Sequence, residues 1–291
     1  MRVTPPGGVA IITACLKRAG YSNIELFDAT WYPVDKEEFS RPDRDKEREK
    51  RQMFPEYKWE RDDVDPDFFT LEKEDMYSAW RKKVIEYKPD VIISSIVEDT
   101  YYIWRKFMDQ ITDQKFISVV GGVFITYNPK IFIGKTDYIC RGEGDEVIPE
   151  LMDLISDGKD GHHLPNIYPN EMRPALNVNT LPPTDHEIFD KRSLYRPFQG
   201  KIIKVATVET QRGCPFRCKF CNSPSNAGLY KEETNSLFFR HRSVEHIEME
   251  IQHLIKTIDV EFLWIVTDTL LTTSKKKFDD FCDMYSKYKI P

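Results

Sequence analysis

Three cysteines that lie close together limit what this chain can fold into more than any other feature. Cys214, Cys218 and Cys221 have the spacing C-x3-C-x2-C, which places three thiolates on one short loop. A closed zinc site or an ordinary iron–sulfur site uses four protein ligands. Three thiolates on a four-iron cluster leave one iron open, and an open iron can bind a substrate. The sequence therefore predicts a reactive metal cluster on this loop.

A zinc site is the alternative interpretation of the same cysteines, because closely spaced cysteines in a reduced protein are often half of such a site. In that case the fourth ligand would be Cys282, His241, His246 or His253. Zinc cysteines, however, usually form C-x2-C pairs with a second pair to match, and this sequence has no second pair. The pattern therefore favours an iron–sulfur cluster.

Composition and charge exclude several classes of protein. With 291 residues the chain is long enough for two domains, each with its own core. A formal net charge of −6 argues against a nucleic-acid-binding surface, and no apolar run approaches the roughly 18–20 residues of a membrane span. The other cysteines, Cys15, Cys140 and Cys282, lie among apolar neighbours. We expect them to be buried free thiols, as is typical of a cytoplasmic protein.

The first part of the chain, residues 1–157, alternates helix and strand patterns and predicts a Rossmann-like α/β domain with a parallel sheet. The expected helices are residues 9–19, 76–87, 101–111 and 146–156, and the expected strands are residues 24–28, 89–96, 116–120 and 138–140. Residues 35–75 are dense in charges of both signs and predict a solvated insertion, punctuated by Pro42, Pro55 and Pro66. Its aromatic residues are expected to pack against the domain: Phe54, Tyr57, Trp59, Phe68 and Phe69.

The second part follows a connector, residues 158–200, whose many prolines exclude regular helix and central strand. Residues 201–291 then predict strand 202–209, the cysteine loop, helix 244–258, strand 262–266 and helix 276–287. This order is the repeat of a (β/α) barrel, in which active sites lie at the carboxyl ends of the strands. The cysteine loop follows the first of these strands.

The cysteine loop resembles the signature of the radical S-adenosylmethionine (SAM) enzymes, C-x3-C-x-aromatic-C, which binds a [4Fe-4S] cluster. Phe220 stands at the aromatic position, and Gly213 and Pro215 match the common form of the loop. The resemblance implies that the three cysteines hold the cluster, that SAM chelates its open iron, and that Phe220 lines the adenine side. It also implies reductive cleavage of SAM to methionine and a 5′-deoxyadenosyl radical, with an electron donor such as flavodoxin or ferredoxin.

Other residues of the second part have weaker matches to the family. Asp268 corresponds to the second acid of a family motif whose first acid is replaced by Thr267, so it either contacts SAM or substrate or caps a turn. Glu250 matches a recurrent family glutamate or forms a salt bridge on its helix. Arg240 and Arg242 either pair with a carboxylate or lie on the surface.

The N-terminal part is similar to the cobalamin-binding domain that is fused to many radical SAM enzymes. The similarity rests on the order of residues 5–8, 88–91, 121–123 and 141–145, each next to an expected strand or helix. Glycines at the carboxyl ends of parallel strands let the backbone approach a large cofactor. The implied cobalamin contacts are Pro6, Gly7, Ser94, Ser95, Gly121, Gly122, Glu143 and Gly144. The sequence has no Asp-x-His-x-x-Gly motif, so no histidine ligand to cobalt is expected, as is usual in this family.

The resemblance implies a radical SAM enzyme of the cobalamin class, with a small-molecule or natural-product-like substrate. Methylation of an unactivated carbon is the expected reaction, while ring formation, rearrangement and methylthiolation stay open. The expected barrel of about six strand–helix units is represented here by about two, so we expect a fragment. The alternatives are a non-catalytic zinc or iron–sulfur module and an inactive truncated fragment.

Overall fold

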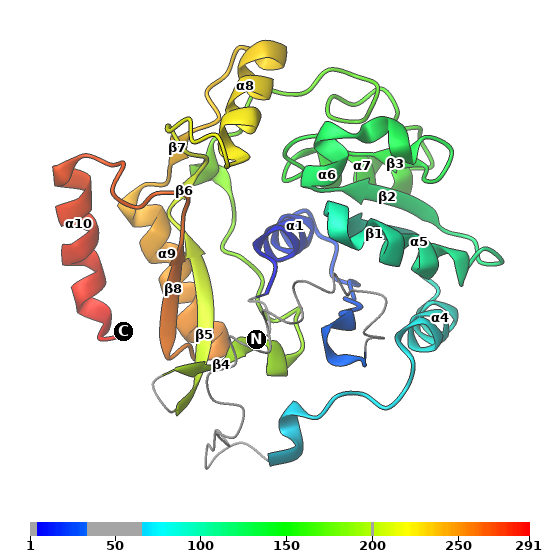
Figure 1. Ribbon diagram of the computed structural model, residues 1–291, viewed down its shortest axis with the longest axis horizontal. Coiled ribbons are helices and arrows are strands. Elements are labelled where there is room, and N and C mark those ends of the chain that lie inside the picture. Colours follow the sequence, from blue (N-terminus) through cyan, green and yellow to red (C-terminus); the bar gives the residue numbers. More distant parts are fainter. Residues whose placement is uncertain (1–4, 34–65, 199–200) are drawn as a thin grey trace.

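The computed structural model describes residues 5–33, 66–198 and 201–291, which form two α/β halves with helix α1 between them (Figure 1). The α-helices of the described residues are α1 (Gly7–Arg18), α4 (Met76–Tyr87), α5 (Tyr101–Asp109), α6 (Val123–Tyr127), α7 (Val147–Ser156), α8 (Ser223–Thr234), α9 (Val244–Ile258) and α10 (Lys275–Tyr285). Most of the expected charged insertion, including Pro42, Pro55, Phe54, Tyr57 and Trp59, lies outside the described residues.

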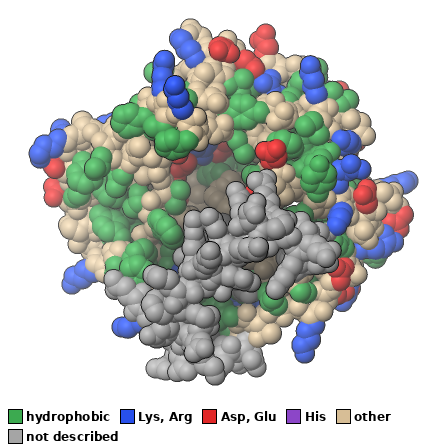
Figure 2. All heavy atoms as spheres, viewed as in Figure 1, with side chains coloured by type: hydrophobic (Ala, Val, Ile, Leu, Met, Phe, Trp, Pro, Cys, Tyr) green, Lys and Arg blue, Asp and Glu red, His purple; other side chains and the backbone are tan. Residues whose placement is uncertain are grey.

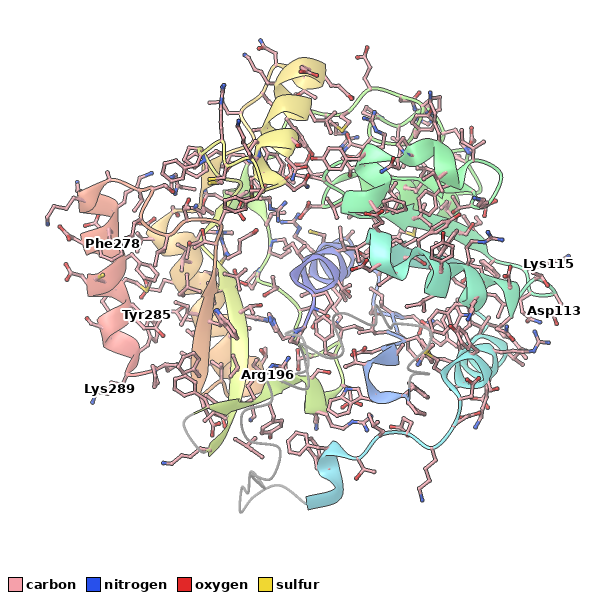
Figure 3. All side chains as sticks on the ribbon, in the orientation of Figure 1. Asp113, Lys115, Arg196, Phe278, Tyr285 and Lys289 are labelled. Carbon is pink, nitrogen blue, oxygen red and sulfur yellow. The ribbon has the colours of Figure 1, made fainter. Side chains whose placement is uncertain are left out.

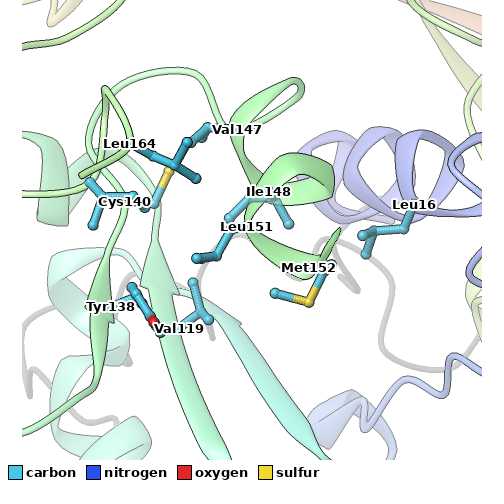
Figure 4. Close-up of a cluster of buried hydrophobic side chains, with 10 residues drawn as sticks. Leu16, Val119, Tyr138, Cys140, Val147, Ile148, Leu151, Met152 and Leu164 are labelled. Atoms are coloured by element: carbon cyan, nitrogen blue, oxygen red, sulfur yellow. The ribbon is translucent and has the colours of Figure 1, made fainter. Parts of the chain in front are cut away.

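The N-terminal half is built on a parallel sheet of β1 (Val91–Ser95), β2 (Ile117–Gly121) and β3 (Tyr138–Ile139), in that order. Helix α7 covers this sheet with an apolar face that repeats at helical spacing. Figure 4 shows how side chains of α1, the sheet and α7 meet in this core. The buried residues of the cluster are Leu16, Val119, Tyr138, Cys140, Val147, Ile148, Leu151, Met152, Leu164 and Ile167.

The prediction of a strand at residues 24–28 is wrong, because this segment has no sheet pairing in the described structure. Its side chains hold it in place instead. Ile24 packs against the core, and the Phe27 ring contacts the rings of Trp80 and Phe107 edge-on. The segment is apolar because its side chains pack against the core, and this gave it the sequence pattern of a strand although it pairs with no other strand of the described structure.

The C-terminal half has a sheet in the order β4-β5-β8, with β5 (Lys201–Glu209) and β8 (Phe262–Val266) parallel. Helix α9 connects these two strands and buries Ile247, Ile251 and Leu254 against them. The sequence did not predict β4 (Tyr195–Phe198), which pairs antiparallel to β5 and contains Pro197. Proline is tolerated there because β4 is an edge strand. A two-residue ladder of β6 (Gln211–Arg212) and β7 (Arg240–His241) was also unforeseen.

Residues of the proline-rich connector help to build the core. Leu176, Val178 and Leu181 are buried against Ile11 and Cys15 of α1, whereas Leu16 of the same helix packs in the core of the N-terminal half. Figure 3 shows the extent of the molecule: Phe278 and Tyr285 lie along α10 at one end of the long axis, and Asp113 and Lys115 lie at the other.

Two further expectations concern thiols and membranes. Burial raises the pKa of the Cys15 and Cys140 thiols to about 12, and both cysteines are buried free thiols as expected. The same expectation is wrong for Cys282, which is exposed on α10, because that helix packs through other residues such as Phe281 and Met284. Within the described ranges, no helix is long and apolar enough to cross a bilayer.

Candidate metal centre and cofactor cavity

The cysteine loop begins at the carboxyl end of β5 and is held between the β6–β7 ladder and α8. Gly213 opens the loop with φ +86°, and a Cβ at this position would lie 2.9 Å from the Phe238 carbonyl oxygen. Only glycine meets both conditions without strain. Cys214 Sγ lies 3.6 Å from Thr269 Oγ1, and Cys221 Sγ accepts a hydrogen bond from the Ser223 amide at 3.4 Å.

The chemistry of the donors, three free thiols on one loop, is that of an iron–sulfur cluster. All three cysteines are free thiols, and Cys218 and Cys221 are exposed. Phe220 between them is 95% exposed. The described residues contain no group of three His, Cys, Asp or Glu side chains arranged to hold a metal ion. The three loop thiols, with or without Cys282, are therefore not gathered around a common point in the described structure.

Asp268 lies just beyond the end of β8 and accepts a 2.6 Å hydrogen bond from Ser223 Oγ at the start of α8. This bond ties the end of the cysteine loop to the carboxyl end of the second parallel strand. The neighbouring Thr267 hydroxyl oxygen is buried without a hydrogen-bond partner in the described residues. Buried polar atoms without a partner often mark the place of an absent ligand or water.

A cavity of about 1880 Å³ lies between the two halves, and the surface in Figure 2 is hollowed near the centre of the face shown. Typical small-molecule sites enclose about 300–1,000 Å³, so this space suits a large cofactor. At Gly7 and Gly8, added Cβ atoms would meet no atom of the described residues within 4 Å. The structure brings all eight sequence-predicted cobalamin contacts to this cavity: Pro6, Gly7, Ser94, Ser95, Gly121, Gly122, Glu143 and Gly144. Cys214, Cys218, Cys221, Phe220 and Asp268 are not among its lining residues.

An ionic cluster that sequence reasoning missed lies at the cavity wall, and we call it the clamp: Glu143, Asp145, Arg212 and Arg240. The first three line the cavity, and Arg240 does not. Glu143 accepts hydrogen bonds from Arg212 at 2.9 Å and from both terminal nitrogens of Arg240 at 2.8 Å. Arg212 also donates to Asp145 at 3.1 Å. Burial alone raises the pKa of Glu143, but the hydrogen bonds and charges of the two arginines outweigh it and hold that pKa below its usual value. The Glu143 carboxylate is therefore ionised, and both of its oxygens already accept hydrogen bonds from protein groups.

Two other acids of the cavity wall differ in their surroundings. Glu250 on α9 is 1% exposed and is paired with Arg242, and it accepts a 2.6 Å hydrogen bond from Thr184. The side chain of Glu209, the last residue of β5, is 39% exposed, and its carboxylate lies 3.4 Å from Arg212 Nε. Burial raises the pKa of Glu209 despite the nearby positive charges of Arg212 and Arg242.

His246, one of the histidines considered for zinc, is engaged by protein groups. Its Nδ1 accepts from Arg242 at 2.8 Å, and its Nε2 lies 2.7 Å from the Leu181 carbonyl oxygen. Arg240 and Arg242 both pair with carboxylates, which is the first of the two outcomes that the sequence left open.

The chain is similar to known proteins in sequence and in fold. No protein-family model matches the chain. Its sequence is 25% identical over 219 residues to an uncharacterised methyltransferase of Pyrococcus horikoshii, covering 70% of this chain and 45% of the relative. It is 23% identical over 299 residues to the anaerobic magnesium-protoporphyrin IX monomethyl ester cyclase of Cereibacter sphaeroides, covering 96% of this chain and 40% of the relative.

The fold is similar to that of TsrM from Kitasatospora setae, a radical SAM methyltransferase solved with a tryptophan substrate and a SAM analogue. The TM-score is 0.51 at 16% sequence identity, over 92% of this chain and 45% of TsrM. At this identity the likeness concerns the fold alone. The chain spans less than half the length of each of these three proteins.

Proposed function

This chain is a relative of the radical SAM enzymes, and we propose that it carries the part of such an enzyme that binds the cluster. Cys214, Cys218 and Cys221 would hold a [4Fe-4S] cluster with one open iron. When bound, that cluster supplies the electron that cleaves SAM reductively. The observation that supports this most strongly is the position of three free thiols on one loop at the carboxyl end of β5, where (β/α) folds place their chemistry.

The residues around the loop would serve the bound SAM. Phe220 is exposed and free to pack against the adenine. Asp268 lies at the adjacent strand end, where its carboxylate, now bonded to Ser223, would accept from the amino group of SAM. Asp268 thus both orders the start of α8 and offers an acceptor next to the cluster.

The large cavity is proposed to bind cobalamin. Its volume, the open space at Gly7 and Gly8, and the Ser94 and Ser95 hydroxyls at the end of β1 support this assignment. Cobalamin, when bound, supplies a transferable methyl group, so the proposed reaction of the whole enzyme is methylation of a small molecule at an unactivated carbon. Relatives named as methyltransferases support this choice. A flavodoxin or ferredoxin in the cytoplasm would supply the electrons.

The test is anaerobic reconstitution with iron and sulfide, followed by electron paramagnetic resonance of the reduced protein with and without SAM. We expect a [4Fe-4S] signal that changes when SAM is added, because the open iron gains two ligands. Cys214→Ser should abolish cluster loading, whereas Cys282→Ser, a matched change at another exposed cysteine, should leave it intact. Zinc bound in place of iron, with loss on Cys282→Ser, would contradict the proposal.

A further inference from the structure

The two arginines of the clamp lie directly opposite each other in the β6–β7 ladder, where Arg212 pairs with Arg240. Like charges at directly opposed positions destabilise a strand pair. This ladder has two residue pairs, so it offers little else to offset the repulsion. One carboxylate oxygen of Glu143, in the other half of the molecule, contacts both arginines. The ladder that carries the cysteine loop therefore depends on an acid from the N-terminal half.

The side chains of the clamp are shielded from water, so each charge depends on its partners in the clamp for stabilisation. The side chains are 16% exposed for Arg212, 13% for Arg240, 11% for Glu143 and 5% for Asp145. Removal of one partner from such a group leaves an uncompensated charge in a poorly hydrated place. Salt screens it less than a surface pair.

The segment that carries Glu143 also contacts the helix after the cysteine loop. The Glu143 amide donates to the Tyr230 hydroxyl on α8 at 2.9 Å. Gly142 has φ +68°, and a Cβ there would lie 2.6 Å from the same hydroxyl. Residues 142–145 thus touch the ladder that precedes the cysteine loop and the helix that follows it.

We propose that Glu143 and Asp145 are positioning residues, which fix the cysteine loop relative to the cavity through Arg212 and Arg240. This inference rests on the proposed function, because the loop is positioned for the cluster and SAM. It changes the role of Glu143 from a cofactor contact to a group that orients the cluster-binding loop.

The first measurement is hydrogen–deuterium exchange in the full chain without cluster. Glu143→Gln and Arg240→Gln should raise exchange at least about tenfold in peptides that span residues 211–222 and 238–242, because local opening becomes easier. Peptides from β1 and β2 should not change. The matched control is Glu233→Gln, which breaks a more exposed ion pair with Arg141 across the same two halves and should leave residues 211–222 unchanged.

The second measurement is the response of the reduced cluster to SAM in the same variants. A misplaced loop should shift the paramagnetic signal obtained with SAM in Glu143→Gln and Arg240→Gln but not in Glu233→Gln, and Glu143→Asp should restore it in part. Unchanged exchange in the ladder, or an equal effect of Glu233→Gln, would overturn the proposal. If Glu143→Gln unfolds the whole chain, amide exchange will also rise in β1 and β2. In that case the proposal is tested by the exchange pattern of Arg240→Gln. If the wild type binds no cluster, the proposed function fails while the exchange measurement still tests the clamp.

Discussion

At the scale of single residues, the pKa values of two carboxyl groups of the cavity wall, Glu143 and Glu209, are shifted in opposite directions. Glu143 is paired with two arginines and has a lowered pKa. Glu209 shares Arg212 with it, but burial dominates and raises its pKa. A carboxyl whose pKa is raised in the folded state contributes stability below its unfolded pKa and loses it as the pH rises through the folded value. For Glu143 the sign is reversed, and stability is lost as the pH falls.

Glu209→Gln should therefore raise the melting temperature at pH 8 and have a smaller effect at pH 5, because it removes a charge that the folded state disfavours. Glu143→Gln is the matched change at the other carboxyl group that contacts Arg212. It should lower the melting temperature, and its effect should be larger at pH 8. Thermal unfolding of both variants at the two pH values checks this. A loss of stability at pH 8 for Glu209→Gln would show that its contact with Arg212 outweighs its burial.

At the scale of elements, sequence patterns located the helices and strands that bury a regular apolar face. Helices α4 and α9 and strand β8 have the predicted bounds. Apolar residues recur at helical spacing in the two helices, whereas β8 is a short uninterrupted apolar run. Helix α8 was missed because it buries little beyond Ser223 and Tyr230 and so has no apolar stripe. The β6–β7 ladder is too short to show a period at all.

The loop cysteines were predicted from local spacing and the cavity-lining residues from a family resemblance, whereas the clamp was not predicted. Spacing alone led to the prediction that Cys214, Cys218 and Cys221 hold a cluster. The clamp joins Glu143 to Arg212 across 69 residues, and no local pattern connects them. The glycines and acid of residues 142–145 suggested a cofactor loop, whereas Gly142 also makes room for Tyr230. Contacts between residues so far apart in the sequence can be identified only from the three-dimensional structure.

The buried ion pair between Glu250 on α9 and Arg242 is expected to stabilise the fold. Glu250→Gln tests this expectation. The change leaves Arg242 without its charged partner in a site that is almost fully buried, and we expect a loss of about 3–5 kcal/mol in unfolding free energy. Glu248→Gln is the control on the same helix. Its side chain is 28% exposed and lies 3.9 Å from the Lys287 ammonium. It also accepts a 2.8 Å hydrogen bond from Tyr288, which the glutamine oxygen can still accept, so the expected loss is below about 1 kcal/mol. Urea unfolding at pH 7 measures both, and equal losses would contradict the role given to Glu250.

At the scale of the whole molecule, a large cavity lies between the two halves, which also contact each other through the poorly hydrated clamp. Connector residues and α1 pack together beside it, and the clamp closes one part of its wall. A ligand that fills such a space binds the folded chain and not the unfolded one. Its binding free energy therefore adds to the stability of the fold.

Hydroxocobalamin at about 100 times its dissociation constant should add about 2.7 kcal/mol to the unfolding free energy, which appears as a higher melting temperature. Gly7→Leu should abolish most of this gain. Gly7 lines the cavity, and no atom of the described residues lies within 4 Å of the added Cβ, so the leucine side chain would occupy space that the ligand needs. Gly228→Leu on α8 is the matched control: its added Cβ also meets nothing within 4 Å, and it does not line the cavity. Both leucines favour helix over glycine, so neither variant should unfold. Equal stabilisation of both variants by hydroxocobalamin would place its binding site elsewhere and leave the cavity for another ligand.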